Sequence, residues 1–437
     1  MYTSRDLKKL LIPLIIEQVL GALMGTVDTV MLTHAGDAAV SGVSLVDSIN
    51  KLIIFLLSAL AAGGTVVCSQ QLGHGDKAAA DTAGKQVILS VFSLSVIIAM
   101  PCIVFRGGLL SLIFGTVEQA VMANARVYFL ITALSYPFIA LFYAGSSIFR
   151  ASGNSALPMR ISVISNVMNI AGNAIAIFAL RAGVMGAAVS TLVSYIFSAI
   201  VMMVYTTKKG LPIEVGNLLG IRPDKTMIKR VLAIGVPAGV ENAMLQFGKL
   251  IVQSTVSTLG TAAIAANAMV TTVETFTSMP SQGIGLGLLT IVGTCIGAGK
   301  VEEAEKYCKK LTGLAFLVLF FVNWGGYFCA RPLMGLTGMT KESAELACSV
   351  LLFISILKPF LWPLAFVPEN GMRAAGDGKF VMTMSSVSMW VFRVGMTWYL
   401  CRCLNVGLMG IWYGWLTDWL FRDIAFSIRF KSGKWKK

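Results

Sequence analysis

Long apolar runs constrain the fold of this chain more than any other feature of its sequence. Hydrocarbon cannot hydrogen-bond a backbone, so a segment that crosses a bilayer forms a helix of about 20 mostly apolar residues. Charged residues make up only 13% of the 437 residues, against about 25% in soluble domains. Twelve segments qualify as predicted membrane helices: residues 10-32, 50-72, 86-105, 127-147, 160-180, 184-205, 231-256, 272-296, 311-330, 347-368, 382-401 and 407-428.

Lysine and arginine are distributed unevenly among the segments that connect these runs. If both chain ends are cytoplasmic, the inner segments hold 24 of these residues, with Arg160 at the inner end of the fifth predicted helix included, and the outer loops hold six. Short loops rich in Lys and Arg remain on the cytoplasmic side of a membrane. The pattern predicts a multi-pass protein of the cell (inner) membrane with both termini inside. The net charge of +14 therefore reflects topology, and we expect no nucleic-acid partner.

The sequence contains an internal duplication. Shifting the first half by 224 positions aligns Pro13 with Pro237, Glu17 with Glu241, and GVMG from Gly183 with GLMG from Gly407. The polar stretch 206-230 predicts a cytoplasmic linker between an N-lobe, residues 1-205, and a C-lobe, residues 231-437. Six helices in each repeat give both halves the same orientation, so a pseudo-two-fold axis should run along the membrane normal.

Several function classes lack their sequence signatures. The chain contains no HExxH, Walker A, GxSxG or paired CxxC motif, which argues against an enzyme. His34 and His74 are the only histidines, and they indicate no metal site. We expect no cofactor, and without a nucleotide-binding domain the energy for any transport must come from an ion gradient or a partner.

Asp28 is the strongest candidate for ion coupling. An ionisable group inside a membrane is costly unless it has a partner or faces a cavity. Burial among Val27, Val30 and Met31 would favour the protonated carboxyl and suit proton exchange. Asn166, Asn169 and Asn173 are spaced i, i+3, i+7, so one face of the fifth predicted helix carries three amides. Their alternative role is to hold helices together by hydrogen bonds.

Three further acids lie within the predicted helices. Glu17 and Glu241 occupy equivalent places in the two repeats, each four residues after a proline, and such symmetry also suits a structural role. Glu274 lies near the outer end of the eighth predicted helix. Each of these acids is a candidate for the coupling site or the substrate cavity.

Basic residues within the predicted helices complicate a pocket for cations. Lys249 and Lys358 would repel a cationic substrate unless each is neutralised, and Lys249 could instead bind an anionic group. Arg393 and Asp418 could form a structural ion pair. Residues that could line an adaptable substrate cavity are Glu17, Tyr136, Tyr143, Gln246, Lys249, Glu274, Met279, Gln282 and Lys358.

Ordered motifs along the whole chain resemble those of the multidrug and toxic compound extrusion (MATE) transporters of bacterial type. The motifs are GTVDTVML in the first predicted helix, QLGHGD after the second, FRASGNSALPM after the fourth, NVMNIAGNAIAIF in the fifth, GVMGAA opening the sixth, and IGAGKVEEA after the eighth. The resemblance implies an all-α fold of twelve helices in two six-helix lobes.

The resemblance also implies a function and some site residues. It implies efflux of organic, often cationic, compounds by alternating access, driven by inward flow of protons or sodium. Glu241 matches a position where many members carry a coupling acid, and Asp28 lies in a family motif. Some members carry Asp where Asn173 stands here. The acid that some members use for sodium in the tenth helix has no counterpart near Lys358.

We therefore predict a multidrug antiporter that exchanges organic, cationic or amphipathic compounds for protons, with protons favoured over sodium. Asp28, Asn166, Asn169, Asn173 and Glu241 are the predicted coupling residues. We expect small-molecule substrates, a bilayer environment and a monomer. The alternative is a flippase for lipid-linked sugars or other lipids, in which Lys249 would bind a phosphate. A channel or receptor is disfavoured by the duplication and by the absence of a sensor domain.

Overall fold

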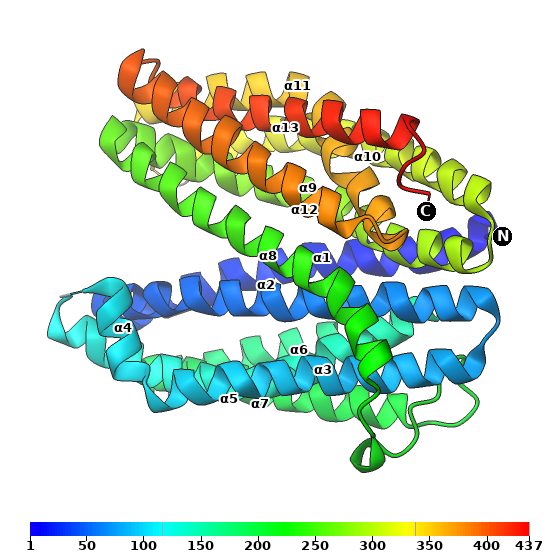
Figure 1. The fold of residues 1–437 in the computed structure, drawn as a ribbon. Helices are drawn as coiled ribbons and strands as arrows, with labels where there is room; N and C mark the ends of the chain where they lie inside the picture. Colours follow the sequence, from blue (N-terminus) through cyan, green and yellow to red (C-terminus); the bar gives the residue numbers. More distant parts are fainter. Residues whose placement is uncertain (116, 337, 437) are drawn as a thin grey trace. The chain divides into compact units, whose positions relative to one another are not determined.

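A computed structural model describes residues 1-115, 117-336 and 338-436, and within these ranges the chain forms helices and no strand (Figure 1). The first half contains α1 (Ser4–Leu32), α2 (Asp37–His74), α3 (Lys77–Val104), the short α4 (Arg106–Phe114), α5 (Gln119–Ala151), α6 (Ala156–Ala174) and α7 (Gly183–Thr206). The second half contains α8 (Lys225–Val256), α9 (Thr261–Gly297), α10 (Val301–Leu336), α11 (Lys341–Ala374), α12 (Gly378–Val387) and α13 (Leu408–Lys431).

Nine helices in the described part of the chain are long and apolar enough to cross a membrane. They are α1, α2, α3, α5, α6 with its continuation to Ala179, α7, α9, α10 and α11. Besides the short α4, three segments that match predicted spans fall outside that set: α8, α13, and α12 with the helical turns that follow it. Of these, α8 carries Glu241 and Lys249, and α13 carries Asp418 and Arg422. The count of twelve spans therefore stays a prediction, while the helical membrane fold is confirmed.

The backbone shows the duplication directly. Gly36 and Gly260, which the shift between the repeats aligns, both have positive φ, of 97° and 91°, and start α2 and α9. Arg181 and Asn405, aligned by the same shift, share the left-handed φ of 52° that is rare outside glycine. π-helical turns at Ile175–Ala179 and Tyr399–Cys403 are aligned in the same way. The two halves therefore repeat local geometry that their side chains only partly share.

Several helices begin before the predicted spans, and the difference is largest for α2 and α9. The predicted starts are residues 50 and 272, whereas α2 begins at Asp37 and α9 at Thr261. The extra turns follow the glycines with positive φ, which end the preceding 3-10 turns and allow a new helix to start. Asp47 and Asn50 consequently lie on α2 rather than in or beside a loop.

Contacts divide the chain into two compact units. The first, called the N-terminal unit below, contains Thr3–Pro13 and Leu20–Gly239. The second, the C-terminal unit, contains Met1–Tyr2, Leu14–Val19 and the residues from Val240 onward. This division does not test the predicted boundaries of the two lobes and the linker, which stay a prediction.

Small residues let helices approach closely inside each unit, as is common in membrane bundles. In the N-terminal unit α5 packs on α2 and α7, and a Cβ on Gly145 of α5 would lie 2.3 Å from Met202 Cγ of α7. In the C-terminal unit α9, α10 and α11 pack together, and a Cβ on Gly371 of α11 would lie 2.5 Å from Cys308 Sγ of α10. This close packing fixes the helix faces that carry the polar groups described next.

Candidate functional site

Asp28 on α1 is joined to the amide face of α6 within the N-terminal unit. The Asn173 side-chain nitrogen donates to Asp28 Oδ1 at 2.9 Å and to Asn169 Oδ1 at 3.1 Å. Asn169 and Asn173 are 6% and 2% exposed, whereas Asp28 is half-buried. The carboxyl group therefore has a buried donor on one side and remains partly accessible on the other.

The Asn169 amide has two possible orientations, and one of them gives Asp28 a second donor. In one, the nitrogen donates to Thr191 Oγ1 of α7 at 3.0 Å. Turned over, the nitrogen donates to Asp28 Oδ1 at 3.1 Å, and the oxygen accepts from Thr191 Oγ1 at 3.0 Å. The second orientation suits an ionised Asp28, because a carboxylate only accepts hydrogen bonds.

Asp47 on α2 is a second acid of this site and is absent from the residues predicted from the sequence. It interacts electrostatically with Asp28, and the Tyr128 hydroxyl on α5 donates to Asp47 Oδ1 at 3.3 Å. Two carboxylates near each other resist being ionised together. The helical pattern of residues 37 to 49 is the sequence signal that could have identified Asp47. Because this segment has low hydropathy, however, Asp47 falls outside the predicted span that starts at residue 50.

The other candidates of the N-terminal unit have mixed surroundings. Tyr136 is fully buried, and its hydroxyl donates to Asn50 Oδ1 at 2.7 Å, which ties α5 to α2. Tyr143 is half-buried and packs against the ring of Phe142. Asn166 is half-buried on α6, and no hydrogen bond of its side chain is found among the described residues. Of the three predicted amides, two therefore join the Asp28 site.

Glu241 on α8 belongs to a buried ionic network in the C-terminal unit. Its Oε2 lies 2.6 Å from Arg373 Nη2 of α11, which also lies 3.3 Å from Glu369 Oε1. Arg422 of α13 lies 3.8 Å from Glu241 and 3.7 Å from Glu369. The predicted coupling acid is thus held between two arginines, and its role stays a prediction.

The same network contains the ion pair that the sequence suggested. Arg393, in a π-helical turn after α12, pairs with Asp418 of α13, which also lies 3.1 Å from Arg422 Nε. Asp418 and Arg422 are 0% exposed and Arg393 is 2% exposed. With Glu241, Glu369 and Arg373, three acids and three arginines balance each other. Such balance is what burial of charge requires.

Glu274 on α9 and Lys358 on α11 form a further buried pair. Lys358 Nζ lies 3.1 Å from Glu274 Oε1, and it donates to the Glu274 carbonyl oxygen at 3.0 Å and to Thr277 Oγ1 at 2.9 Å. Ser278 Oγ donates to the Glu274 carboxylate at 2.8 Å. Lys358 is therefore neutralised in place, and its charge is not presented alone to a substrate.

Lys358→Met is expected to destabilise the protein by about 3 kcal/mol, because it leaves the Glu274 carboxylate buried without its cation. The double variant Lys358→Met with Glu274→Gln should regain most of that loss, since no unpaired charge remains. Thermal unfolding of both purified variants in detergent measures the difference. Equal stability of the single and double variants would contradict this account of the pair.

The remaining candidates lie on α1, α8 and α9. Glu17 is 8% exposed and belongs to the C-terminal unit. Lys249 is exposed on α8, where its charge interacts with Glu274, and Gln246 is half-buried one turn earlier. Met279 is half-buried and Gln282 is exposed on α9. Within the described residues, no three His, Cys, Asp or Glu side chains are grouped so that they could hold a metal ion.

A family model described as MatE matches the chain twice, over residues 13-175 and 237-399. The starts of the two matches, Pro13 and Pro237, are the prolines that the internal duplication aligns. The chain is 27% identical to an uncharacterized transporter, YisQ, of Bacillus subtilis over 97% of this chain and 93% of the relative. It is also 27% identical to a probable multidrug resistance protein, NorM, of Thermotoga maritima, over 99% and 93%.

Solved structures show the same fold. A MOP superfamily transporter from Pyrococcus furiosus, 20% identical, superposes with a TM-score of 0.89 over 98% of this chain and 96% of its own. At this identity the likeness concerns architecture alone. It confirms the predicted all-α, two-lobed fold class.

Proposed function

The chain belongs to the MatE family of multi-pass membrane transporters, and from that premise we propose that it is a secondary antiporter that exports organic compounds in exchange for protons. Two comparisons support export: the NorM relative is named a probable multidrug resistance protein, and a relative 22% identical over 84% of this chain, MepA of Staphylococcus aureus, is named a multidrug export protein. The substrates of this chain would be cationic or amphipathic small molecules.

The contact between Asp28 and Asn173 carries the proposal. Ionised Asp28 accepts the Asn173 hydrogen bond, and after protonation it can instead donate one. Asp47 of α2 adds like charge near Asp28. Protonation would thus change how α1 is held against α6. That change is the differential interaction a coupling ion needs in order to shift a conformational equilibrium.

Protons fit this site better than sodium. Sodium would need several oxygen ligands, whereas the Asn173 nitrogen occupies one carboxylate oxygen of Asp28. The transporter would then need no resident cofactor, only the proton gradient across the cell membrane. The excess of Lys and Arg in alternate loops supports placing both termini in the cytoplasm, and each chain would work as a monomer.

The interactions of the buried and exposed lysines with Glu274 argue against the flippase alternative. A phosphate-binding cavity would need an available base, yet Lys358 is already held by Glu274 and Thr277, and the charge of Lys249, the base that this alternative assigns to the phosphate, interacts with the same Glu274. Cationic and amphipathic compounds are therefore the better substrate class for this chain.

Proteoliposomes with independently set proton and sodium gradients test the proposal. We expect a cationic dye to accumulate in vesicles with an acidic lumen and no sodium gradient, because protons leaving the lumen would drive the dye inward. A sodium gradient alone should give no accumulation, and an anionic dye should not be transported. If neither gradient drives net movement of any dye, the antiporter proposal is wrong. Dye accumulation driven by a sodium gradient alone would show that sodium, and not the proton, is the coupling ion.

A further inference from the structure

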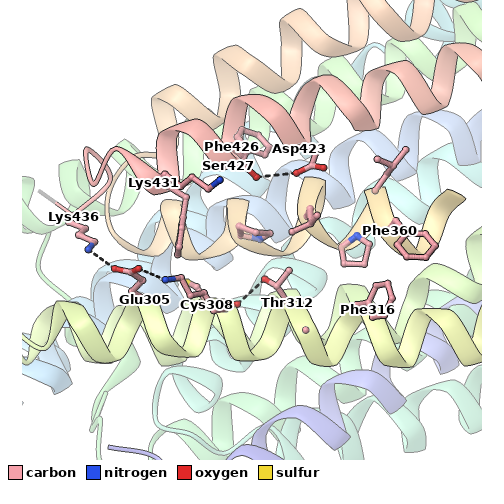
Figure 2. Close-up of a pocket in the computed structure, with 17 residues that line it drawn as sticks. Glu305, Cys308, Thr312, Phe316, Phe360, Asp423, Phe426, Ser427, Lys431 and Lys436 are labelled. Atoms are coloured by element: carbon pink, nitrogen blue, oxygen red, sulfur yellow. Dashed lines mark hydrogen bonds and ion pairs between the residues drawn. The ribbon is translucent and has the colours of Figure 1, made fainter.

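A cavity of about 690 Å³ lies among α10, α11 and α13 of the C-terminal unit, apart from every candidate coupling residue (Figure 2). Its walls include Phe316 of α10, Phe360 and Leu364 of α11, and Phe426 of α13. α10 and α11 both have the length and composition of membrane helices. An occupant would therefore lie within a membrane-crossing part of the protein and contact mostly apolar side chains.

The charged groups of the cavity, apart from Asp423, gather at one end. Figure 2 shows Glu305, Lys431 and Lys436 at one end and the rings of Phe316 and Phe360 at the other. Glu305 is shared by Lys309 at 2.6 Å and Lys436 at 2.5 Å, so two lysines face one carboxylate. Lys431 has no ion pair or hydrogen bond of its side chain among the described residues. This end, which we call the basic end, therefore carries excess positive charge.

The other repeat provides an internal comparison. The shift that aligns the repeats relates Asp423, Ser427 and Lys431 of α13 to Ala199 and Met203 of α7 and to Thr207, which follows that helix. Those three residues line a smaller cavity of about 290 Å³, and no charged side chain of the described residues lines it. Among the described residues, charged groups therefore line the cavity of the second repeat and not that of the first.

The first repeat also shows how the space beside this groove is filled. Gly84 of α3 corresponds to Cys308 in the C-terminal cavity, and a Cβ on Gly84 would lie 2.9 Å from Ile213 Cγ2. Ile213 and Val215, which follow α7, are 1% and 0% exposed. Apolar chain occupies that space in one repeat, so an apolar group would suit the open counterpart in the other.

We propose that this cavity binds one anionic phospholipid, with its phosphate at the basic end and an acyl chain along Phe316, Phe360 and Leu364. Basic pockets between membrane helices bind anionic lipid headgroups through charge attraction. Eleven residues of α10 separate Glu305 from Phe316, which corresponds to about 16 Å at 1.5 Å per residue. The cavity thus has the length and the separation of charge from apolar surface that a lipid requires.

Asp423 is the one acid of the cavity away from the basic end. Its Oδ1 accepts a hydrogen bond from Ser427 at 3.0 Å, and eight residues, about 12 Å along the helix, separate it from Lys431. Asp423 and Lys431 form no ion pair among the described residues, so the charge of Lys431 is not directly neutralised. A cationic amphipath would use the opposite set of contacts, with Asp423 as its partner and Lys431 as a repelling group.

Filling the cavity provides the first test. A Cβ on Gly313, which lines the cavity, meets no atom within 4 Å, and the same holds for Gly325 on the same helix outside it. Both glycines are exposed, so Gly325→Leu is a matched control for Gly313→Leu. Native mass spectrometry of the purified full chain, titrated with dioleoylphosphatidylglycerol, should show one tightly bound lipid that Gly313→Leu removes and Gly325→Leu retains.

Charge provides the second test. Lys431→Gln should weaken binding of phosphatidylglycerol about fivefold, the effect of one lysine near an anionic headgroup, and should leave phosphatidylcholine binding unchanged. Asp423→Asn should change neither lipid. The proposal is overturned if the Gly313→Leu and Gly325→Leu variants bind phosphatidylglycerol equally well. It is also overturned if Lys431→Gln strengthens, and Asp423→Asn weakens, binding of tetraphenylphosphonium, since the site would then take cations. These measurements need no transport, so they stand apart from the antiport assay.

Discussion

Asp28→Asn is expected to reduce proton-driven dye accumulation about tenfold or more, the range over which one site typically changes the equilibrium at another. Asparagine keeps the size of aspartate and its ability to bond with Asn173, which donates to Asp28 at 2.9 Å. It cannot gain or lose a proton, however, so the site loses its two charge states. The measurement is accumulation in proteoliposomes with an acidic lumen.

Asp37→Asn is the matched control for this prediction. Asp37 is exposed in the first turn of α2, so the same chemical change there should leave transport intact. Binding of dye without a gradient should survive in both variants, which separates coupling from substrate recognition. If Asp28→Asn retains full accumulation and full substrate-induced proton release, the assignment of Asp28 is wrong.

Asp418→Asn is expected to destabilise the protein by about 5 kcal/mol, at the upper end of the range for breaking a buried ion pair. Asp418 pairs with both Arg393 and Arg422, and all three side chains are 3% exposed or less. Arginine is not deprotonated in proteins, so neither partner can become neutral to avoid the cost. The loss should therefore exceed that expected for Lys358→Met.

Denaturant or thermal unfolding in detergent measures this loss, and an exposed pair serves as control. Lys77 Nζ lies 3.0 Å from Glu214 Oε1, and its side chain is 57% exposed. Lys77→Gln should cost at most about 1 kcal/mol, as is usual for surface pairs. Adding Arg393→Met to Asp418→Asn should recover part of the stability. Wild-type stability of Asp418→Asn would show that the network does not hold the C-terminal unit together.

The two predictions separate different uses of buried charge. In the N-terminal unit Asp28 has amide donors and a like charge nearby, an arrangement in which the carboxyl can change state. In the C-terminal unit Glu241, Glu369 and Asp418 are opposed by three arginines. Acids that are ion-paired with arginine suit a rigid unit that moves as a whole. An acid such as Asp28, which has amide donors instead of a cationic partner, suits a switch.

Sequence patterns were sufficient for the parts of this protein that depend on neighbouring residues. Apolar runs placed most of the helices, because a bilayer requires each crossing segment to satisfy its own backbone. The constant shift between matching motifs predicted a repeat that reappears in the φ angles of Gly36 and Gly260. The early starts of α2 and α9 were missed, because their first turns are helical without being strongly apolar.

Only the tertiary structure decided which buried charges are paired. The sequence could nominate Asp28 and Glu241 alike, since both are acids in apolar helices, but their partners are 145 and 132 residues away. Helical periodicity determines the face on which a side chain lies, whereas packing of distant helices determines what that face meets. For this reason the amides opposite Asp28, the arginines opposite Glu241 and the acid Asp47 became visible only in the folded chain.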